Sequence, residues 1–190
     1  MKNWKLYTWR ALEGIAIIAA LVGLVLQYQS LQEQKILGAW QLITTKASGN
    51  SGKIQALEFL NSKGVPLVGV ALSNAYLSGV NLKGAILQHA HFELTDLTKA
   101  NFEGADLRGA NFEGADSYFI NFTRASLRKA TFTGANFTNA RYHNCDLSDA
   151  NFTRANLSGA DFTRADLSDA NFEGADLTYS QTLNHCILII

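Results

Sequence analysis

Large apolar side chains recur at every fifth position from residue 67 to residue 177, which makes 23 successive units of five residues. Leu, Phe or Tyr occupies these positions, and Ser117 is the single exception. A small residue, usually Ala, stands two positions before each large one, as in Ala100-Asn101-Phe102. Residues two apart in an extended chain point to the same side. The pattern therefore predicts a repeat array whose core contains both residues of every unit.

The residue types repeat again at every fourth unit. This second period predicts a column with four sides, in which two mainly aromatic walls alternate with two mainly leucine walls. The aromatic walls contain Phe92, Phe112, Phe132, Phe152 and Phe172, and opposite them Phe102, Phe122, Tyr142 and Phe162. The other walls contain Leu87, Leu107, Leu127, Leu147 and Leu167, and Leu77, Leu97, Phe137, Leu157 and Leu177.

The motif Ala-(Asp/Asn)-(Leu/Phe)-x-x, repeated over these units, resembles the pentapeptide-repeat family. The resemblance covers about three fifths of the chain. It implies an all-β fold, a right-handed quadrilateral β-helix with one unit per side and four units per coil. It also implies a protein that works by binding, since some members resemble duplex DNA in shape and charge and bind type II topoisomerases.

The N-terminal region predicts a membrane segment. Residues Gly14 to Leu26 carry no charge, and a helix from Trp9 to Tyr28 would be about 28 Å long, close to the thickness of a hydrocarbon core. We expect a single transmembrane helix with aromatic residues at both interfaces. A cleavable signal peptide is the first alternative, although no small-x-small cleavage site follows, and a soluble helix is the second. The basic residues before the span favour a cytoplasmic N-terminus and a repeat array on the non-cytoplasmic side.

The predicted organisation has four parts. Residues 1–29 form the membrane anchor with its flanks, and residues 30–64 form a stalk helix, a turn-rich connector and a short helix. That helix, at about residues 54–61, is expected to cap the array, because an uncovered solenoid end exposes core and strand edges. Residues 65–180 form the β-helix. Residues 181–190 form an apolar tail, which either caps the far end or binds a partner.

Charge and polar residues argue against several functions. The whole chain has 16 basic and 16 acidic residues, without the basic excess of a nucleic-acid binder. The four histidines are scattered, and the Asp and Asn residues before each large apolar residue are typical of turns. We expect no catalytic residues, no metal site and no cofactor. Cys145 occupies a small inward slot and is interpreted as a buried hydrophobe.

Candidate partner-binding residues lie at the departures from the repeat. Tyr118 and Phe119 follow the break at Ser117, and two interpretations stay open. Either both aromatic side chains are exposed for binding, or a local bulge tucks Phe119 into the core in place of Ser117. The full candidate set is Tyr76, Tyr118, Phe119, Tyr179, Arg128, Lys129, Ile187 and Ile189.

The sequence thus predicts a non-enzymatic, membrane-anchored scaffold that binds other proteins, in or beside a membrane complex. The resemblance suggests a thylakoid or bacterial inner membrane, because anchored members are frequent in photosynthetic bacteria. One alternative is a soluble DNA mimic that binds a type II topoisomerase. The array's 13 acidic residues, interrupted by nine basic ones, argue against it. A secreted lumenal or periplasmic repeat protein is the other alternative, and self-association stays open.

Overall fold

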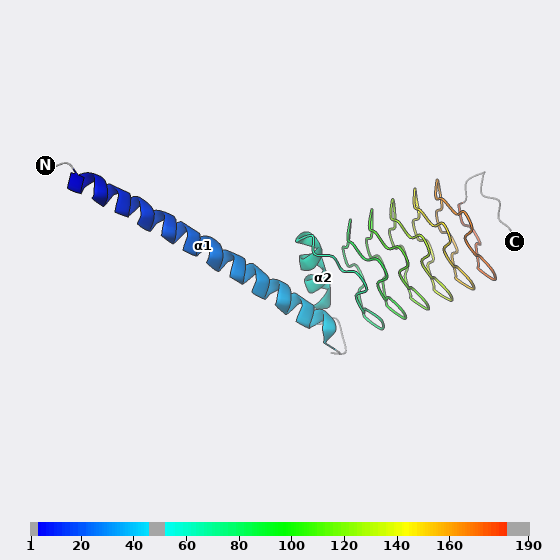
Figure 1. Ribbon diagram of the computed structural model, residues 1–190. Helices are drawn as coiled ribbons and strands as arrows, with labels where there is room; N and C mark the ends of the chain where they lie inside the picture. Colours follow the sequence, from blue (N-terminus) through cyan, green and yellow to red (C-terminus); the bar gives the residue numbers. More distant parts are fainter. Residues whose placement is uncertain (1–3, 46–51, 182–190) are drawn as a thin grey trace. The chain divides into compact units, whose positions relative to one another are not determined.

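The computed structural model describes residues 4–45 and 52–181, with side chains in the first helix described from residue 18 onward. The chain divides into two compact units, Met1–Trp40 and Gln41–Ile190. Its two helices are α1 (Trp4–Thr44) and α2 (Lys53–Ser62). A stack of short-sided coils follows α2, as Figure 1 shows.

Helix α1 contains the residues for which the sequence predicts a membrane segment and a stalk. Described apolar side chains between Ile18 and Leu26 are more than half exposed. Among the described residues, no helix is both long and apolar enough to cross a membrane. The predicted span starts at Trp9, and the side chains of its residues 9–17 lie outside the described ones. The prediction of a transmembrane helix is therefore not supported by the described residues.

Helix α2 ends in a Schellman motif. Gly64 has a φ of 65°, in the left-handed region that glycine adopts without a Cβ penalty. Its N–H donates to the oxygen of Asn61 (2.9 Å), and the N–H of Val65 donates to the oxygen of Leu60 (3.0 Å). These bonds pair the last helical carbonyls and direct the chain into the first repeat.

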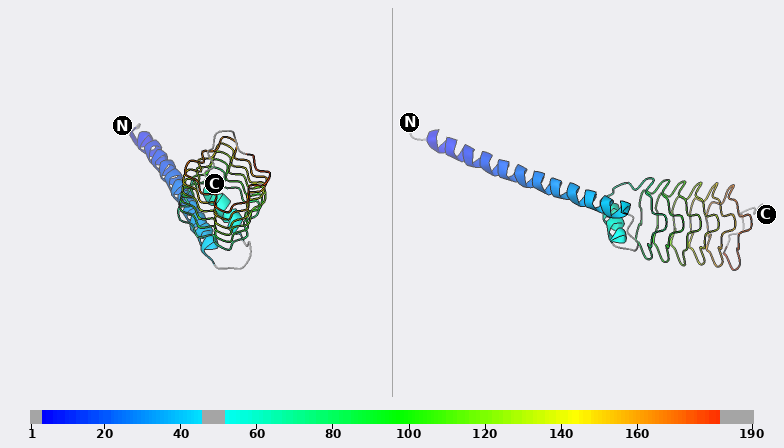
Figure 2. Two further views of the ribbon diagram at one scale, coloured as in Figure 1. Left: turned by 90° about the vertical axis from the view of Figure 1, so that its right-hand side faces the viewer. Right: turned by 90° about the horizontal axis from the view of Figure 1, so that it is seen from below.

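The repeat region is a column of coils joined by parallel β-bridges. Each bridge pairs residues four units apart, from Ala71 with His91 to Asp161 with Gln181. Backbone N–H groups donate to the neighbouring coil, as from Phe112 to the oxygen of Thr131 (2.7 Å). Each side of a coil carries one such bridge, so the described residues contain isolated bridges and no strand of several residues. Two further views show the coils stacked (Figure 2). The predicted coil of four sides, with one unit on each, is confirmed.

We name the four sides by their central inward residues. Side A contains Leu72, Phe92, Phe112, Phe132, Phe152 and Phe172. Side B contains Leu77, Leu97, Ser117, Phe137, Leu157 and Leu177. Side C contains Leu82, Phe102, Phe122, Tyr142 and Phe162, and side D contains Leu67, Leu87, Leu107, Leu127, Leu147 and Leu167.

Aromatic stacking fills the core between sides A and C. On side A, Phe132 stacks on Phe112 and Phe152 with ring centroids 5.1 and 4.5 Å away. On side C, Tyr142 stacks on Phe122 and Phe162 at 5.4 and 4.8 Å. Rings on opposite sides meet edge to face, as for Phe132 and Tyr142. Such pairs contribute about 0.5–1.5 kcal/mol each beyond area burial. The two predicted aromatic walls are confirmed.

The corners of each coil are tight turns. The N–H of Ala115 donates to the oxygen of Phe112 (3.0 Å), and the same bond recurs around the column. Asp and Asn side chains support these turns, as where Oδ1 of Asn151 accepts from the N–H of Thr153 (3.0 Å). Their predicted role as turn residues is confirmed.

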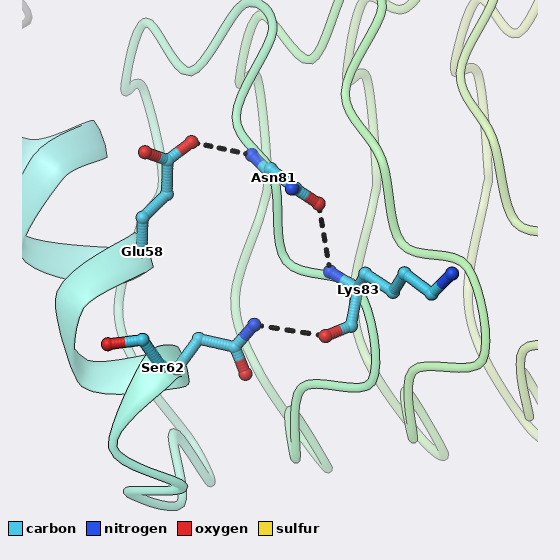
Figure 3. A pocket seen from close by; sticks show the side chains of 5 residues that line it. Glu58, Ser62, Asn81 and Lys83 are labelled. Atoms are coloured by element: carbon cyan, nitrogen blue, oxygen red, sulfur yellow. Dashed lines mark hydrogen bonds between the residues drawn. The ribbon is translucent and has the colours of Figure 1, made fainter.

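Helix α2 covers the first coil, as Figure 3 shows. Its Leu57 and Leu60 are completely buried. The carboxylate of Glu58 accepts a hydrogen bond from the N–H of Asn81 (2.9 Å), and Nδ2 of Asn61 donates to the oxygen of Lys83 (3.0 Å). The helix thereby buries the apolar end of the core and pairs groups at the first edge, as the sequence predicts.

The last described coil is less well covered. Its inward residues, including Leu167, Phe172 and Leu177, are partly exposed, whereas the inward residues of the earlier coils are buried. The apolar tail that the sequence predicts as a second cap lies outside the described residues.

One buried group lacks a partner, and it generates a prediction. Among the described side chains, the hydroxyl of Tyr142 is the buried polar atom without a hydrogen bond. An unpaired buried hydroxyl costs about 1–3 kcal/mol. We expect Tyr142→Phe to raise the free energy of unfolding by about 1 kcal/mol, measured by thermal or chemical denaturation. The matched variant Phe122→Tyr should lower it. A less stable Tyr142→Phe variant would contradict this packing.

Candidate protein-interaction surface

The break in the repeat is an exchange of side-chain size. Ser117 occupies a slot that elsewhere holds Leu, Phe or Tyr, and Ile120 occupies the next small slot, which usually holds Ala. Both side chains are completely buried. The Ser117 hydroxyl donates to the oxygen of Leu97 (3.0 Å), so it is paired. Ile120 supplies part of the volume that Ser117 lacks.

The corner at this exchange is open. Among the described turns of the array, Ser117 to Ile120 is the one without a hydrogen bond from the fourth residue's N–H to the first residue's oxygen. The neighbouring turns on side B retain it, from Ala100 to Leu97 (2.9 Å) and from Ala140 to Phe137 (3.1 Å). Branching at the small slot does not by itself open a turn, because Val80 occupies the same slot on side B and donates to the oxygen of Leu77 (3.0 Å).

Two aromatic side chains project from this open turn. Tyr118 is 43% exposed and Phe119 is 56% exposed. Phe119 also has a φ of 61°, which is unusual for a bulky residue. The backbone stays joined to the coils on either side, because the N–H of Lys99 donates to Tyr118 and that of Phe119 donates to Thr138. The interpretation in which Phe119 is buried is therefore wrong. Both aromatic side chains are exposed, and their role in binding stays a prediction.

The other predicted aromatic residues share side B but do not join this pair. Tyr76 is 62% exposed and Tyr179 is 87% exposed. With about 4.8 Å between coils, Tyr76 lies two coils before the pair and Tyr179 lies three coils after Phe119. The compact cluster therefore consists of Tyr118 and Phe119, which we call the aromatic pair.

The remaining predicted residues lie elsewhere. Arg128 and Lys129 are exposed on side D, and Nε of Arg128 lies 3.4 Å from Oδ2 of Asp149. Ile187 and Ile189 lie outside the described residues. A role for any of these four in binding stays a prediction.

Electrostatic contacts on side D hold charged groups in internal pairs. The Arg108 guanidinium donates to both carboxylate oxygens of Asp106 at 2.8 Å, and Nε2 of Gln88 donates to Oδ2 at 2.6 Å. The bonds from Arg108, followed by that from Gln88, lower the pKa of Asp106 to about 2, against an opposing effect of burial. Asp106 and Arg108 thus neutralise each other at neutral pH.

Cys145 is buried, as predicted. Burial raises the pKa of its thiol to about 12, and the thiol donates to the oxygen of Phe122 (2.7 Å). Burial also raises the pKa of Tyr142 well above its usual range. Both groups are therefore neutral and unreactive at physiological pH.

A shallow depression lies between α2 and the first coil (Figure 3). Its lining includes Glu58, Asn61 and Asn81, which bind one another or the adjoining backbone. Lys83 pairs with Glu103 at 3.1 Å, and the Ser62 hydroxyl donates to Phe59. We assign this depression to the cap because its polar groups are engaged in holding the helix in place.

Sequence reasoning missed two features of the surface. Leu94 is 64% exposed at a corner with a φ of 55°, and its only signal is a large apolar residue at a turn position. Side C carries four basic residues against two acidic ones, whereas each of the other sides has more acidic than basic residues. The sequence shows this difference in charge only when the units are grouped by side, with every fourth unit in the same group.

Comparison with known proteins identifies the repeat and several similar structures. The family model for pentapeptide repeats matches eight copies at residues 67–114, 119–141 and 143–178. The unmatched residues 115–118 include Ser117 and Tyr118. No curated protein matches the chain.

Three solved structures illustrate the similarity. The pentapeptide-repeat protein Rfr23 of the cyanobacterium Cyanothece 51142 is 22% identical, with 67% of this chain and 97% of that chain covered and a TM-score of 0.48. A pentapeptide-repeat protein of the Arabidopsis thaliana thylakoid lumen is 33% identical, with 60% and 69% covered and a TM-score of 0.21. QnrB1, a plasmid-mediated fluoroquinolone resistance protein, is 24% identical, with 60% and 70% covered and a TM-score of 0.35.

The family model covers more than half of the chain, and members of this family fold as right-handed quadrilateral β-helices. The bridges between every fourth unit and the paired inward slots agree with that fold. The chain belongs to the pentapeptide-repeat family.

Proposed function

We propose that this protein is a non-enzymatic scaffold that binds a partner protein through the aromatic pair, Tyr118 and Phe119. The observation that carries the proposal is the exposure of Tyr118 and Phe119 at the one described corner of the array that lacks its closing hydrogen bond. Phe119 also has a left-handed backbone conformation. That conformation costs a residue with a Cβ roughly 1–2 kcal/mol. The same conformation recurs at the corresponding corner residue of the other described units, as at Leu94 and Lys99, so it belongs to the coil geometry.

The chemistry of the pair supports a protein partner. Aromatic side chains are enriched among the residues that dominate protein–protein binding energy. Hydrogen bonds to the coils on both sides hold the backbone of the pair at Lys99 and Thr138. A partner would therefore meet two aromatic side chains on a rigid backbone, which reduces the ordering cost of binding.

The polar residues around the column support a scaffold rather than an enzyme. Oδ1 of Asp146 accepts from the N–H and the hydroxyl of Ser148, and Asn151 does the same for Thr153. These side chains stabilise the corners of the coils. The absence of enzymatic activity stays a prediction.

Substitution of the aromatic pair tests the proposal. We expect Tyr118→Ser/Phe119→Gly to lose the partner that the full-length protein retains in affinity purification from its own cells in mild detergent. The same variant should be more stable by about 1 kcal/mol, because glycine adopts the left-handed conformation without strain. Stability would be measured by thermal denaturation.

A matched control is Ile86→Ser, which removes a 41% exposed apolar side chain on side D. The partner should be retained by this control. Retention of the same partner by the aromatic double variant would contradict the proposal.

We also propose that the apolar part of α1 attaches the scaffold to a membrane. Leu21, Val22 and Val25 are 57%, 51% and 55% exposed. Contiguous exposed apolar surface is typical of sites that contact lipid or other proteins. The uncharged run from Gly14 to Leu26 extends this surface in the sequence.

Fractionation checks the attachment. The full-length protein should stay in the membrane pellet after a carbonate wash, whereas Leu21→Asp/Val25→Asp should shift it to the soluble fraction, because charged groups disfavour lipid contact. The control Gln27→Asp/Gln29→Asp adds the same charge beyond the apolar run and should stay in the pellet. Release of the unaltered protein by carbonate would contradict the attachment.

A further inference from the structure

Side C differs from the rest of the column in its charge. Its outward residues include Lys83, Arg124, Arg141 and Arg164, against Glu103 and Asp161. Lys83 and Glu103 neutralise each other in an ion pair of 3.1 Å. The uncompensated charge is therefore concentrated on the three arginines.

These three arginines are unpaired. In the part of the chain that the structure describes, none of them forms an ion pair, whereas Arg108 and Arg128 on side D each lie beside an aspartate. All three are exposed. Unpaired guanidinium groups are available for bidentate binding to carboxylates.

One of the arginines, Arg141, adjoins the open turn. The N–H of Arg141 donates to the oxygen of Ile120 (3.0 Å), the residue that follows Phe119. Arg141 also forms the parallel bridge with Asn121 on the preceding coil, and Arg124 follows Asn121 by three residues. With about 4.8 Å between coils, Arg124, Arg141 and Arg164 lie on three successive coils. We call these three arginines the basic strip. Arg141 lies beside the corner of the aromatic pair, and Arg124 and Arg164 lie at the other corner of side C.

We infer that the partner of the aromatic pair is an acidic protein segment, with an apolar side chain against Tyr118 and Phe119 and carboxylates on Arg124 and Arg141. This inference rests on the proposed function and names the chemistry of its partner. Aromatic and arginine side chains together are the residue types enriched in binding hot spots. Complementary charge would speed the encounter and fix the orientation of the segment.

The acidic residues on both sides of the basic strip favour a protein segment over a nucleic acid as its ligand. Side B carries Asp96 and Asp116, and side D carries five acidic residues, so acidic groups lie on both neighbouring sides. A nucleic acid binds broad basic surfaces through many phosphates. A single peptide segment would follow the strip and meet side B only at the corner of the aromatic pair.

The test uses the full-length protein, immobilised at its N-terminus, and a random peptide library displayed on phage. Peptides enriched by the unaltered protein should combine an aromatic or aliphatic residue with at least two acidic residues. For a selected peptide, Arg124→Glu/Arg141→Glu should weaken binding roughly tenfold, and added salt should weaken it as well. Arg124→Gln/Arg141→Gln should give a smaller loss in the same direction.

The matched control is Arg154→Glu, which reverses an exposed, unpaired arginine at a corner of side A and should change affinity less than twofold. Equal weakening by this control, enrichment of peptides without acidic residues, or equally effective displacement by a short DNA duplex would overturn the inference.

The outcomes also separate this inference from the proposed function. Peptides that need the aromatic pair but carry no acidic residues would overturn the acidic partner alone. Peptides that bind equally well to Tyr118→Ser/Phe119→Gly, or a selection that enriches nothing, would overturn both.

Discussion

The volume inside a coil is the constraint on which the column depends. Each side contributes one large and one small inward side chain, and successive coils are held at a fixed spacing by their backbone hydrogen bonds. Native cores are packed as densely as organic crystals, so a coil has little room to adapt. The residue in the small slot, usually Ala, also donates the backbone hydrogen bond that completes the turn.

The region around Ser117 meets this constraint in another way. The large inward position holds the small residue Ser117, and the small inward position three residues later holds the large residue Ile120. Both side chains are completely buried, but the corner lacks its closing hydrogen bond. The turn then carries Tyr118 and Phe119 on its outer surface. The local change in packing and the exposed aromatic pair therefore coincide at one corner.

The regular part of the fold could be predicted from sequence because each residue in a coil repeats the environment of the residue four units earlier. The columns of Phe132 and Leu127 and the cap at Leu57 and Leu60 follow from such periodicity and from helical spacing. Whether the Phe119 side chain is buried or exposed could not be predicted in this way. Periodicity shows that Ser117 is too small for its slot, and only the packing shows that Ile120 compensates.

The charge pattern illustrates a different limit. The total charge of the array is acidic, and it conceals the basic strip on side C. Sorting by sides needs the coil length, which the sequence supplies, but the absence of ion-pair partners for Arg124, Arg141 and Arg164 among the described residues needs side-chain geometry. The basic strip and the aromatic pair are adjacent at Arg141, because its N–H donates a hydrogen bond to the oxygen of Ile120 on the neighbouring coil.

Amide hydrogen exchange of the full-length protein tests the central claim, that the turn from Ser117 to Ile120, which presents the aromatic pair, lacks its closing hydrogen bond. Ala100 and Ala140 occupy the equivalent positions in the neighbouring coils, and their N–H groups close their turns. We predict that the amide of Ile120 exchanges at least about tenfold faster than those two, because it lacks that bond. Equal protection of the three amides would contradict the claim.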